Sequence, residues 1–333
     1  MMGVFLGITT TIMDPSLFRS FCDVVGVWDI PLLSMIIREN GRVKKRFFWR
    51  KFMKRCLFLA LTVFVFPMGA SSEEISSDKK SEKLILQQQQ AARRTQQTAE
   101  NTLGTKADLF SLHKLNYAVI GSDDLMLQYG FKYRAIDTKQ LFVAFTNYMI
   151  WEVYKESIPV YDNNFNPELF YRFTANSKWL PAIDAGYWHL SNGQAGVTGR
   201  SWDRLATRLL YDHSNNKRPS LVTVEIFPLT LSKGDYNEDI GQYLGWWNFN
   251  TMVQNIFQHP SGQGLDVGFQ LWSGAHGVPF DRGNYKINIL YPIYLWPNFN
   301  PTLMVQYFDG YGEVIRDYNI KTEKLRFGVA LYY

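Results

Sequence analysis

Cysteine is almost absent from this chain of 333 residues, because its two copies, Cys22 and Cys56, both lie within the first 70 positions. The rest of the chain therefore excludes disulfide bonds, thiolate metal sites and a cysteine nucleophile. Long apolar runs are also missing after residue 70, which excludes a membrane-spanning helix there. Aromatic residues, in contrast, make up 16% of the chain against 20% charged residues, and rigid apolar side chains of this kind favour β-strands.

An excess of positive charge is confined to the amino-terminal part. Of 35 basic and 30 acidic residues, ten and four fall within positions 1–70, which leaves 25 basic and 26 acidic residues in the remainder. The main part of the chain thus has no basic surplus of the kind that nucleic-acid binding requires. We expect no nucleic-acid partner.

A targeting segment near the amino terminus accounts for the position of both cysteines and for the local excess of positive charge. From Met53 the sequence MKRCLFLALTVFVFPMGA has a basic start, an apolar core of about a dozen residues and small residues at its end, as a secretory signal peptide does. We interpret residues 53–70 as the signal peptide, Met53 as the true start and residues 1–52 as a mis-assigned extension. The alternative is an amphipathic or membrane-anchored extension, and amino-terminal sequencing of the mature protein distinguishes the two.

The chain changes character at Phe110. Residues 71–109 are polar and rich in glutamine, which predicts a helical or disordered arm on the periplasmic side. From residue 110 to residue 333, segments of about ten residues alternate with turn-rich pieces such as DNNFNP and FDRGN. This pattern of short segments and turns predicts one domain made of short strands.

The strands alternate between apolar and polar residues. In residues 127–135, one face carries Leu, Tyr, Phe, Tyr and Ala, and the other carries Gln, Gly, Lys and Arg; residues 325–333 show the same pattern. Aromatic faces of this length are typical of a transmembrane barrel, whose strands meet lipid on one side and a polar lumen on the other. We predict an all-β, antiparallel outer-membrane barrel of about twelve strands.

Three side chains with catalytic potential come together in this pattern. With a period of two, His189 and Ser191 share one face of a strand. In the next strand, Asp203 lies on one face, and Arg204 and Arg208 lie on the other. Because arginines belong in the lumen, Asp203 is expected on the lipid side, paired with His189. Such a trio could perform acyl transfer, although an inert histidine beside a serine is the commoner occurrence of this spacing.

The run HLSNGQAGVTGRSWDR, residues 189–204, resembles the signature of the outer membrane phospholipase A family, and ESIPVYDNNFNPELFYRF upstream resembles the loop and strand that precede its active site. The resemblance implies a twelve-stranded barrel that works as a homodimer in the outer membrane. It also implies calcium-dependent hydrolysis of acyl esters at either position of glycerophospholipids and in lysophospholipids, that is, phospholipase A1 and A2 activity.

The resemblance also implies roles for individual residues. Ser191 corresponds to the nucleophile, His189 to the base, and the backbone N–H of Gly193 to an oxyanion donor. Asp203 stands where the family commonly has asparagine, and we expect a carboxylate to hold the imidazolium at least as firmly.

Calcium ligands follow from the same resemblance. They are expected at the backbone carbonyls of Gln194 and Gly199 and at the hydroxyl of Ser157, the last contributed by the partner subunit. Because the turn offers no acidic side chain, we expect weak calcium binding by the monomer and tighter binding by the dimer.

Other polar residues have less specific interpretations. Asn147 is either a polar group seeking a partner in lipid or a solvated residue near the rim. His113, His213, His259 and His276 lack metal-ligand spacing and are interpreted as surface residues. The alternatives to an enzyme are a passive porin or structural barrel and a lipid-binding barrel without turnover.

Overall fold

The computed structural model describes residues 109–136, 140–177, 179–212, 220–257, 264–275, 282–293 and 301–331, together with 81–82, 85–86 and 89–90. The predicted signal peptide, the segment before it and most of the polar arm lie outside the described residues. Among the described residues, no helix combines the length and apolarity needed to cross a bilayer.

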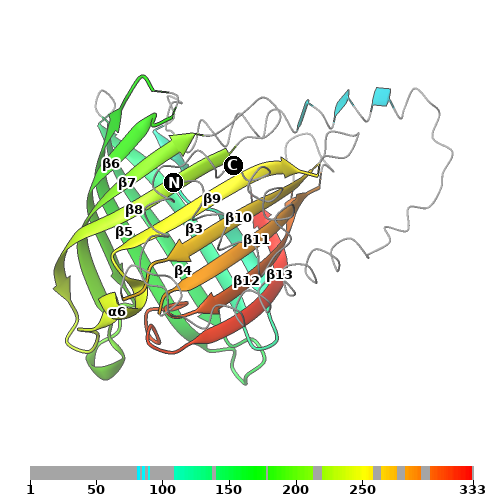
Figure 1. Cartoon of the computed structure of the whole chain (residues 1–333). Helices are drawn as coiled ribbons and strands as arrows, with labels where there is room; N and C mark the ends of the chain where they lie inside the picture. Colours follow the sequence, from blue (N-terminus) through cyan, green and yellow to red (C-terminus); the bar gives the residue numbers. More distant parts are fainter. Residues whose placement is uncertain are drawn as a thin grey trace, which may run out of the picture. The chain divides into compact units, whose positions relative to one another are not determined.

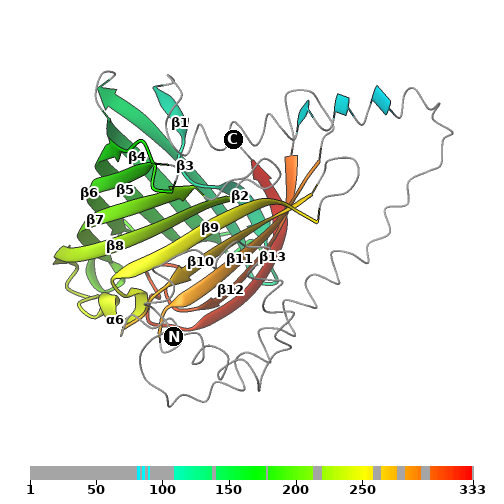
Figure 2. The same cartoon turned by 45° about the horizontal axis from the view of Figure 1, so that its top comes forward.

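Within the described residues, thirteen strands form one sheet, and twelve of them close into an antiparallel barrel (Figures 1 and 2). Closure comes from β13 pairing with β2, where Phe327 lies opposite Ile120 and Leu331 opposite Asn116. The short strand β1 (Phe110–Leu112) pairs with β3 beyond the end of β2. The prediction of an antiparallel barrel of about twelve strands is therefore confirmed.

The twelve strands of the barrel are β2 (Asn116–Ile120), β3 (Leu125–Ile136), β4 (Leu141–Trp151), β5 (Val160–Thr174), β6 (Ala182–Ser191), β7 (Ser201–Asp212), β8 (Ser220–Lys233), β9 (Trp247–Ile256), β10 (Leu265–Trp272), β11 (Asn284–Pro292), β12 (Pro301–Gly310) and β13 (Thr322–Leu331).

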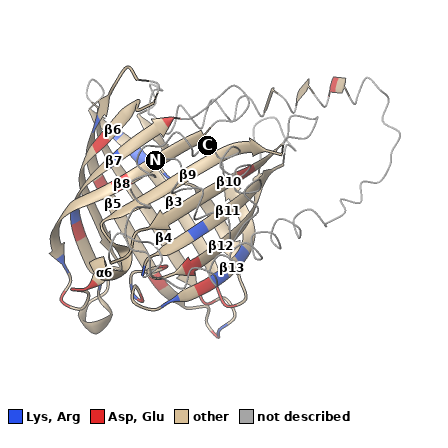
Figure 3. Ribbon diagram, viewed as in Figure 1, with Lys and Arg blue, Asp and Glu red and all other residues tan. Residues whose placement is uncertain are grey.

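Alternation along the strands separates an apolar outer wall from an inner wall that carries both polar and apolar residues. In β3, Lys132 is buried inside at 2% exposure, while Tyr129 and Tyr133 are 40% and 44% exposed on the outside. In β13, Arg326 is fully buried and Phe327 is 52% exposed. Figure 3 shows charged residues at only scattered positions on the strands, as expected where one face meets lipid.

Buried side chains from several strands meet inside the barrel. One cluster joins Tyr117 of β2 and Ile150 of β4 to Leu290 of β11 and Met304 of β12. A second cluster contains Phe142, Ala144, Phe170, Trp188, Ala206 and Phe227. Arg204 lies in the same interior, with its guanidinium carbon 4.2 Å from the ring centroid of Trp202 and 4.4 Å from that of Phe227. Cation–π contacts of this kind allow aromatic rings and arginines to share one interior.

One end of the barrel carries the connections that shape the site. The short helix α6 (Ile240–Leu244) and the connection 311–321 pack with Leu190 and Trp202 of the barrel wall. The N–H of Arg316 donates to Asp162 at the start of β5, 3.1 Å away. Asp162 in turn accepts from Asn192 at the end of β6, so the turn after β6 is tied to these connections.

Candidate active site

Strands β6 and β7 place the three predicted catalytic side chains on the outer wall. In β6, Trp188 and Leu190 are buried at 3% and 5% exposure and pack inside the barrel. The alternate residues His189 and Ser191 therefore face outward. On β7, Asp203 alternates with buried neighbours and also faces outward, directly across the ladder from His189.

A short polar contact joins the histidine to the aspartate. His189 Nδ1 lies 2.6 Å from Asp203 Oδ1, and both side chains are only partly exposed, at 25% and 21%. The hydroxyl of Tyr187 donates to the same carboxylate oxygen. Ser191 is two residues beyond His189 on the same face, and within the described part of the chain no hydrogen bond joins its hydroxyl to the imidazole.

A buried asparagine organises the turn after β6. The side-chain oxygen of Asn192 accepts from the N–H of Arg200 at 2.9 Å and from that of Gln194 at 3.3 Å. Its amide nitrogen donates to the carbonyl of Thr198 at 2.9 Å and to Asp162 at 3.3 Å. Asn192 therefore holds both ends of the turn beside Ser191. Sequence analysis did not assign this role, because no local pattern indicates it.

Gly193 adopts a conformation that other residues avoid. Its φ is +66°, and a Cβ atom there would lie 3.1 Å from the ring of Phe165, which pairs with Ser191 across the ladder. Among the described residues, no hydrogen bond engages the N–H of Gly193. This position thus combines a glycine-favouring backbone with a donor that is available next to the serine.

The three predicted calcium ligands occupy two neighbouring connections. The carbonyl oxygen of Gln194 lies 2.5 Å from the point that a Cβ of Gly199 would occupy. The Gly199 carbonyl accepts a hydrogen bond from Arg200 Nη1 at 2.9 Å. Ser157 is exposed in the connection 152–159, with φ of 64°. The described residues contain no group of three or more His, Cys, Asp or Glu that could hold a metal. The three expected ligands are themselves uncharged oxygens, which fit calcium in type.

Asn147 is fully buried although β4 places it on the outer face. Its amide nitrogen donates to Asn163 Oδ1 at 2.7 Å and to the carbonyl of Asn164 at 3.1 Å. The interpretation as a solvated rim residue is therefore wrong. Strand β5 supplies acceptors for the amide nitrogen, while the side-chain oxygen of Asn147 is buried without a hydrogen-bond partner among the described residues.

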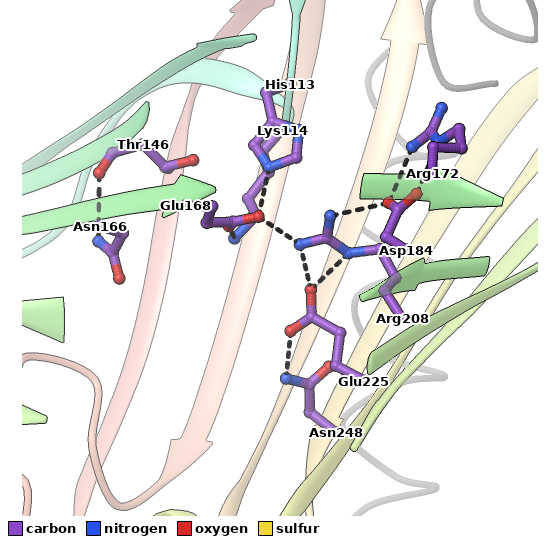
Figure 4. A network of polar contacts seen from close by, with 10 residues as sticks. All are labelled: His113, Lys114, Thr146, Asn166, Glu168, Arg172, Asp184, Arg208, Glu225 and Asn248. Carbon is purple, nitrogen blue, oxygen red and sulfur yellow. Dashed lines mark hydrogen bonds and ion pairs between the residues drawn. The ribbon is translucent and has the colours of Figure 1, made fainter. Parts of the chain in front are cut away.

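A charged network lines the interior behind the site (Figure 4). Arg208 Nη2 lies 2.6 Å from Glu168 and 2.6 Å from Glu225, and Arg208 Nη1 lies 3.3 Å from Asp184. His113 joins this network, with Nε2 3.0 Å from Glu168 and a side chain only 8% exposed. The prediction that His113 is a surface residue is therefore wrong, because the connection between β1 and β2 turns it into the barrel. The other three histidines interpreted as surface residues lie outside the described residues.

Comparison with known proteins gives a consistent result. The model of the phospholipase A1 family matches residues 83–331. Curated relatives named phospholipase A1 include those of Salmonella typhimurium and Escherichia coli K12, each 29% identical to this chain, over 182 and 184 residues. These alignments cover 53% of this chain and 56% of each relative, so the chain spans about half the length of the curated relatives it matches.

Solved structures share the fold. The calcium-bound dimer of the Salmonella typhi outer membrane phospholipase superposes with a TM-score of 0.58 at 22% identity, covering 69% of this chain and 97% of that one. The Escherichia coli outer membrane phospholipase A gives the same TM-score and identity over 70% of this chain.

Fold and site together define a membrane-type β-barrel that carries a serine, a histidine and an aspartate on its outer wall. Within that class, the chain belongs to the phospholipase A1 family, whose model covers its whole described barrel.

Proposed function

We propose that this protein is a calcium-dependent phospholipase of the outer membrane that hydrolyses acyl esters at both positions of glycerophospholipids and in lysophospholipids. The observation that carries the proposal is the 2.6 Å contact between His189 and Asp203 on the outer wall, beside Ser191. Polar groups on a lipid-facing surface are costly and are therefore rare without a function. Family membership supports the same reaction.

Acylation follows from the positions of these groups. His189 accepts the proton of the Ser191 hydroxyl at Nε2 while Ser191 Oγ attacks the ester carbonyl of a lipid that reaches the wall laterally. Asp203 accepts the Nδ1 hydrogen of His189, which fixes the tautomer and stabilises the imidazolium. The N–H of Gly193 donates to the oxyanion. Collapse of the tetrahedral intermediate releases the lysophospholipid alcohol, which takes the proton from His189, and leaves an acyl ester on Ser191.

Deacylation follows the same order of steps, with water as the nucleophile. His189 removes a proton from the water that attacks the acyl ester, and it returns this proton to Ser191 Oγ as the fatty acid leaves. Bound calcium would supply electrostatic stabilisation of the oxyanion. The carbonyls of Gln194 and Gly199 would hold it, together with Ser157 of a second copy of the chain.

The homodimer belongs to the same proposal. Ser157 is exposed and projects from the connection next to the catalytic turn, at the same end of the barrel. The calcium-bound Salmonella typhi neighbour is itself a dimer. We accordingly assign residues 53–70 to export, residues 71–109 to a periplasmic arm and residues 110–333 to the catalytic barrel.

Interior packing weighs against the alternative of a passive porin. The cluster that joins β2 and β4 to β11 and β12 packs buried apolar side chains against one another within the barrel, whereas a porin keeps a water-filled channel.

Release of fatty acid from mixed phospholipid–detergent micelles tests the proposal. We expect wild-type protein to release fatty acid with calcium and not with a chelator, and Ser191→Ala to be inactive in both conditions. Ser201→Ala is the matched control, because Ser201 lies directly opposite Ser191 on β7 and should retain activity. Conductance without chelator-sensitive release of fatty acid would instead identify a porin.

A further inference from the structure

Tyr187 lies two residues before His189 on the outer face of β6, and its hydroxyl donates to Oδ1 of Asp203. This is the oxygen that also contacts His189 Nδ1. In the ladder Tyr187 pairs with Leu205, so it reaches Asp203 diagonally across the two strands. Diagonal neighbours are within reach of long aromatic side chains. One oxygen of the Asp203 carboxylate therefore accepts hydrogen bonds from two side chains of the same strand.

The location of Asp203 makes the second donor important. A carboxylate on the lipid-facing wall has little water to solvate it, and hydrogen bonds are what keeps such a charge in place. Among the described residues, His189 and Tyr187 are the side chains that hydrogen-bond Asp203. The neighbouring Arg204 lies inside the barrel against aromatic rings and does not supply such a bond.

We propose that Tyr187 is a positioning residue of the catalytic trio, which acts through Asp203 by fixing its carboxylate toward His189. This inference rests on the proposed function. Hydrogen bonds to charged groups are stronger than those between neutral groups, so the benefit of the tyrosine hydroxyl should depend on the negative charge at position 203. A role in packing alone would not show this dependence, because the ring would pack equally well beside an amide.

A double-mutant cycle separates the two roles. We expect Tyr187→Phe to lower kcat about tenfold with KM unchanged. Asp203→Asn keeps an acceptor oxygen for the imidazole but removes the charge. In the Asp203→Asn background, we expect Tyr187→Phe to change kcat by less than about twofold. Equal losses in both backgrounds, or no loss in either, would overturn the proposal.

Two controls keep the outcome interpretable. Tyr171→Phe removes a hydroxyl from another tyrosine of the outer wall, 40% exposed on β5, and should leave kcat unchanged. If Tyr187→Phe does not fold, Tyr187→Leu offers a second variant without the hydroxyl and with a side chain suited to lipid. Inactive wild-type protein would contradict the proposed function, whereas active wild-type protein without coupling would contradict only the role of Tyr187.

Discussion

The carbonyl oxygen of Gln194 faces Gly199 so closely that a Cβ atom at position 199 would lie 2.5 Å from it. Gly199 has an ordinary φ of −68°, so an alanine there is excluded by the neighbouring carbonyl and not by its own backbone. Both residues are proposed calcium ligands through their carbonyls, so the spacing of their backbones at this point bears directly on the proposed site.

Gly199→Ala should therefore force the two carbonyls apart. We expect its calcium affinity to fall roughly tenfold or more, measured by isothermal titration calorimetry on the dimer. Gly241→Ala is the control, because a Cβ at Gly241 meets nothing within 4 Å. Unchanged affinity in Gly199→Ala would remove this turn from the calcium site.

Ser157→Ala tests whether the partner subunit contributes a ligand. We expect the wild-type monomer to bind calcium weakly and the dimer more tightly, as measured by titration in monomeric and dimeric detergent conditions. The variant should bind with the weak affinity in both states, because it lacks the hydroxyl supplied in trans. Equal affinities of monomeric and dimeric wild-type protein would contradict the shared site.

Asp203→Ala should lower kcat by roughly ten- to a hundredfold, because it removes a charged hydrogen-bond acceptor from His189. Asp203→Asn should retain more activity, since its amide oxygen can still accept the Nδ1 hydrogen. The two variants are compared by initial rates of fatty acid release at saturating calcium. Full activity of Asp203→Ala would show that the aspartate has no part in the reaction.

Arg208→Ala should destabilise the barrel without touching the outer wall. The guanidinium contacts three buried carboxylates. Arg172 still pairs with Asp184 and Lys114 with Glu168 after its removal, but Glu225 loses its cation inside the barrel, at a cost of about 3–5 kcal/mol. Urea unfolding in lipid vesicles measures this loss. Lys155→Ala is the control, because it removes the ion pair of an exposed lysine with Glu152, a pair worth at most about 1 kcal/mol. Equal effects of the two substitutions would contradict a structural role for the network.

The barrel and the faces of its strands were predictable because alternation with a period of two decides which residues meet lipid. The same rule placed His189 and Asp203 on one face, and the structure pairs them directly across the ladder. Periodicity along one strand carries no information about diagonal contacts, so the bond from Tyr187 to Asp203 was not predicted.

Contacts between side chains of different strands account for the other differences. His113 looks like a loop residue in sequence, but it contacts Glu168, which is 55 positions away along the chain. For Asn147 the sequence pattern does not distinguish lipid from solvent, because its partner, Asn163, lies on the next strand. Both contacts depend on which strands become neighbours and on where their side chains point, and the local pattern specifies neither.

Covalent labelling tests the central claim, that the outward hydroxyl of Ser191 is the nucleophile, most directly. Wild-type protein is treated with a long-chain alkylsulfonyl fluoride in calcium-containing micelles, and the modified peptide is mapped by mass spectrometry. We predict one sulfonyl group per chain on Ser191, with parallel loss of hydrolysis and much slower labelling in Asp203→Ala. An active protein that is modified at another residue, or that stays active and unmodified, would contradict the account.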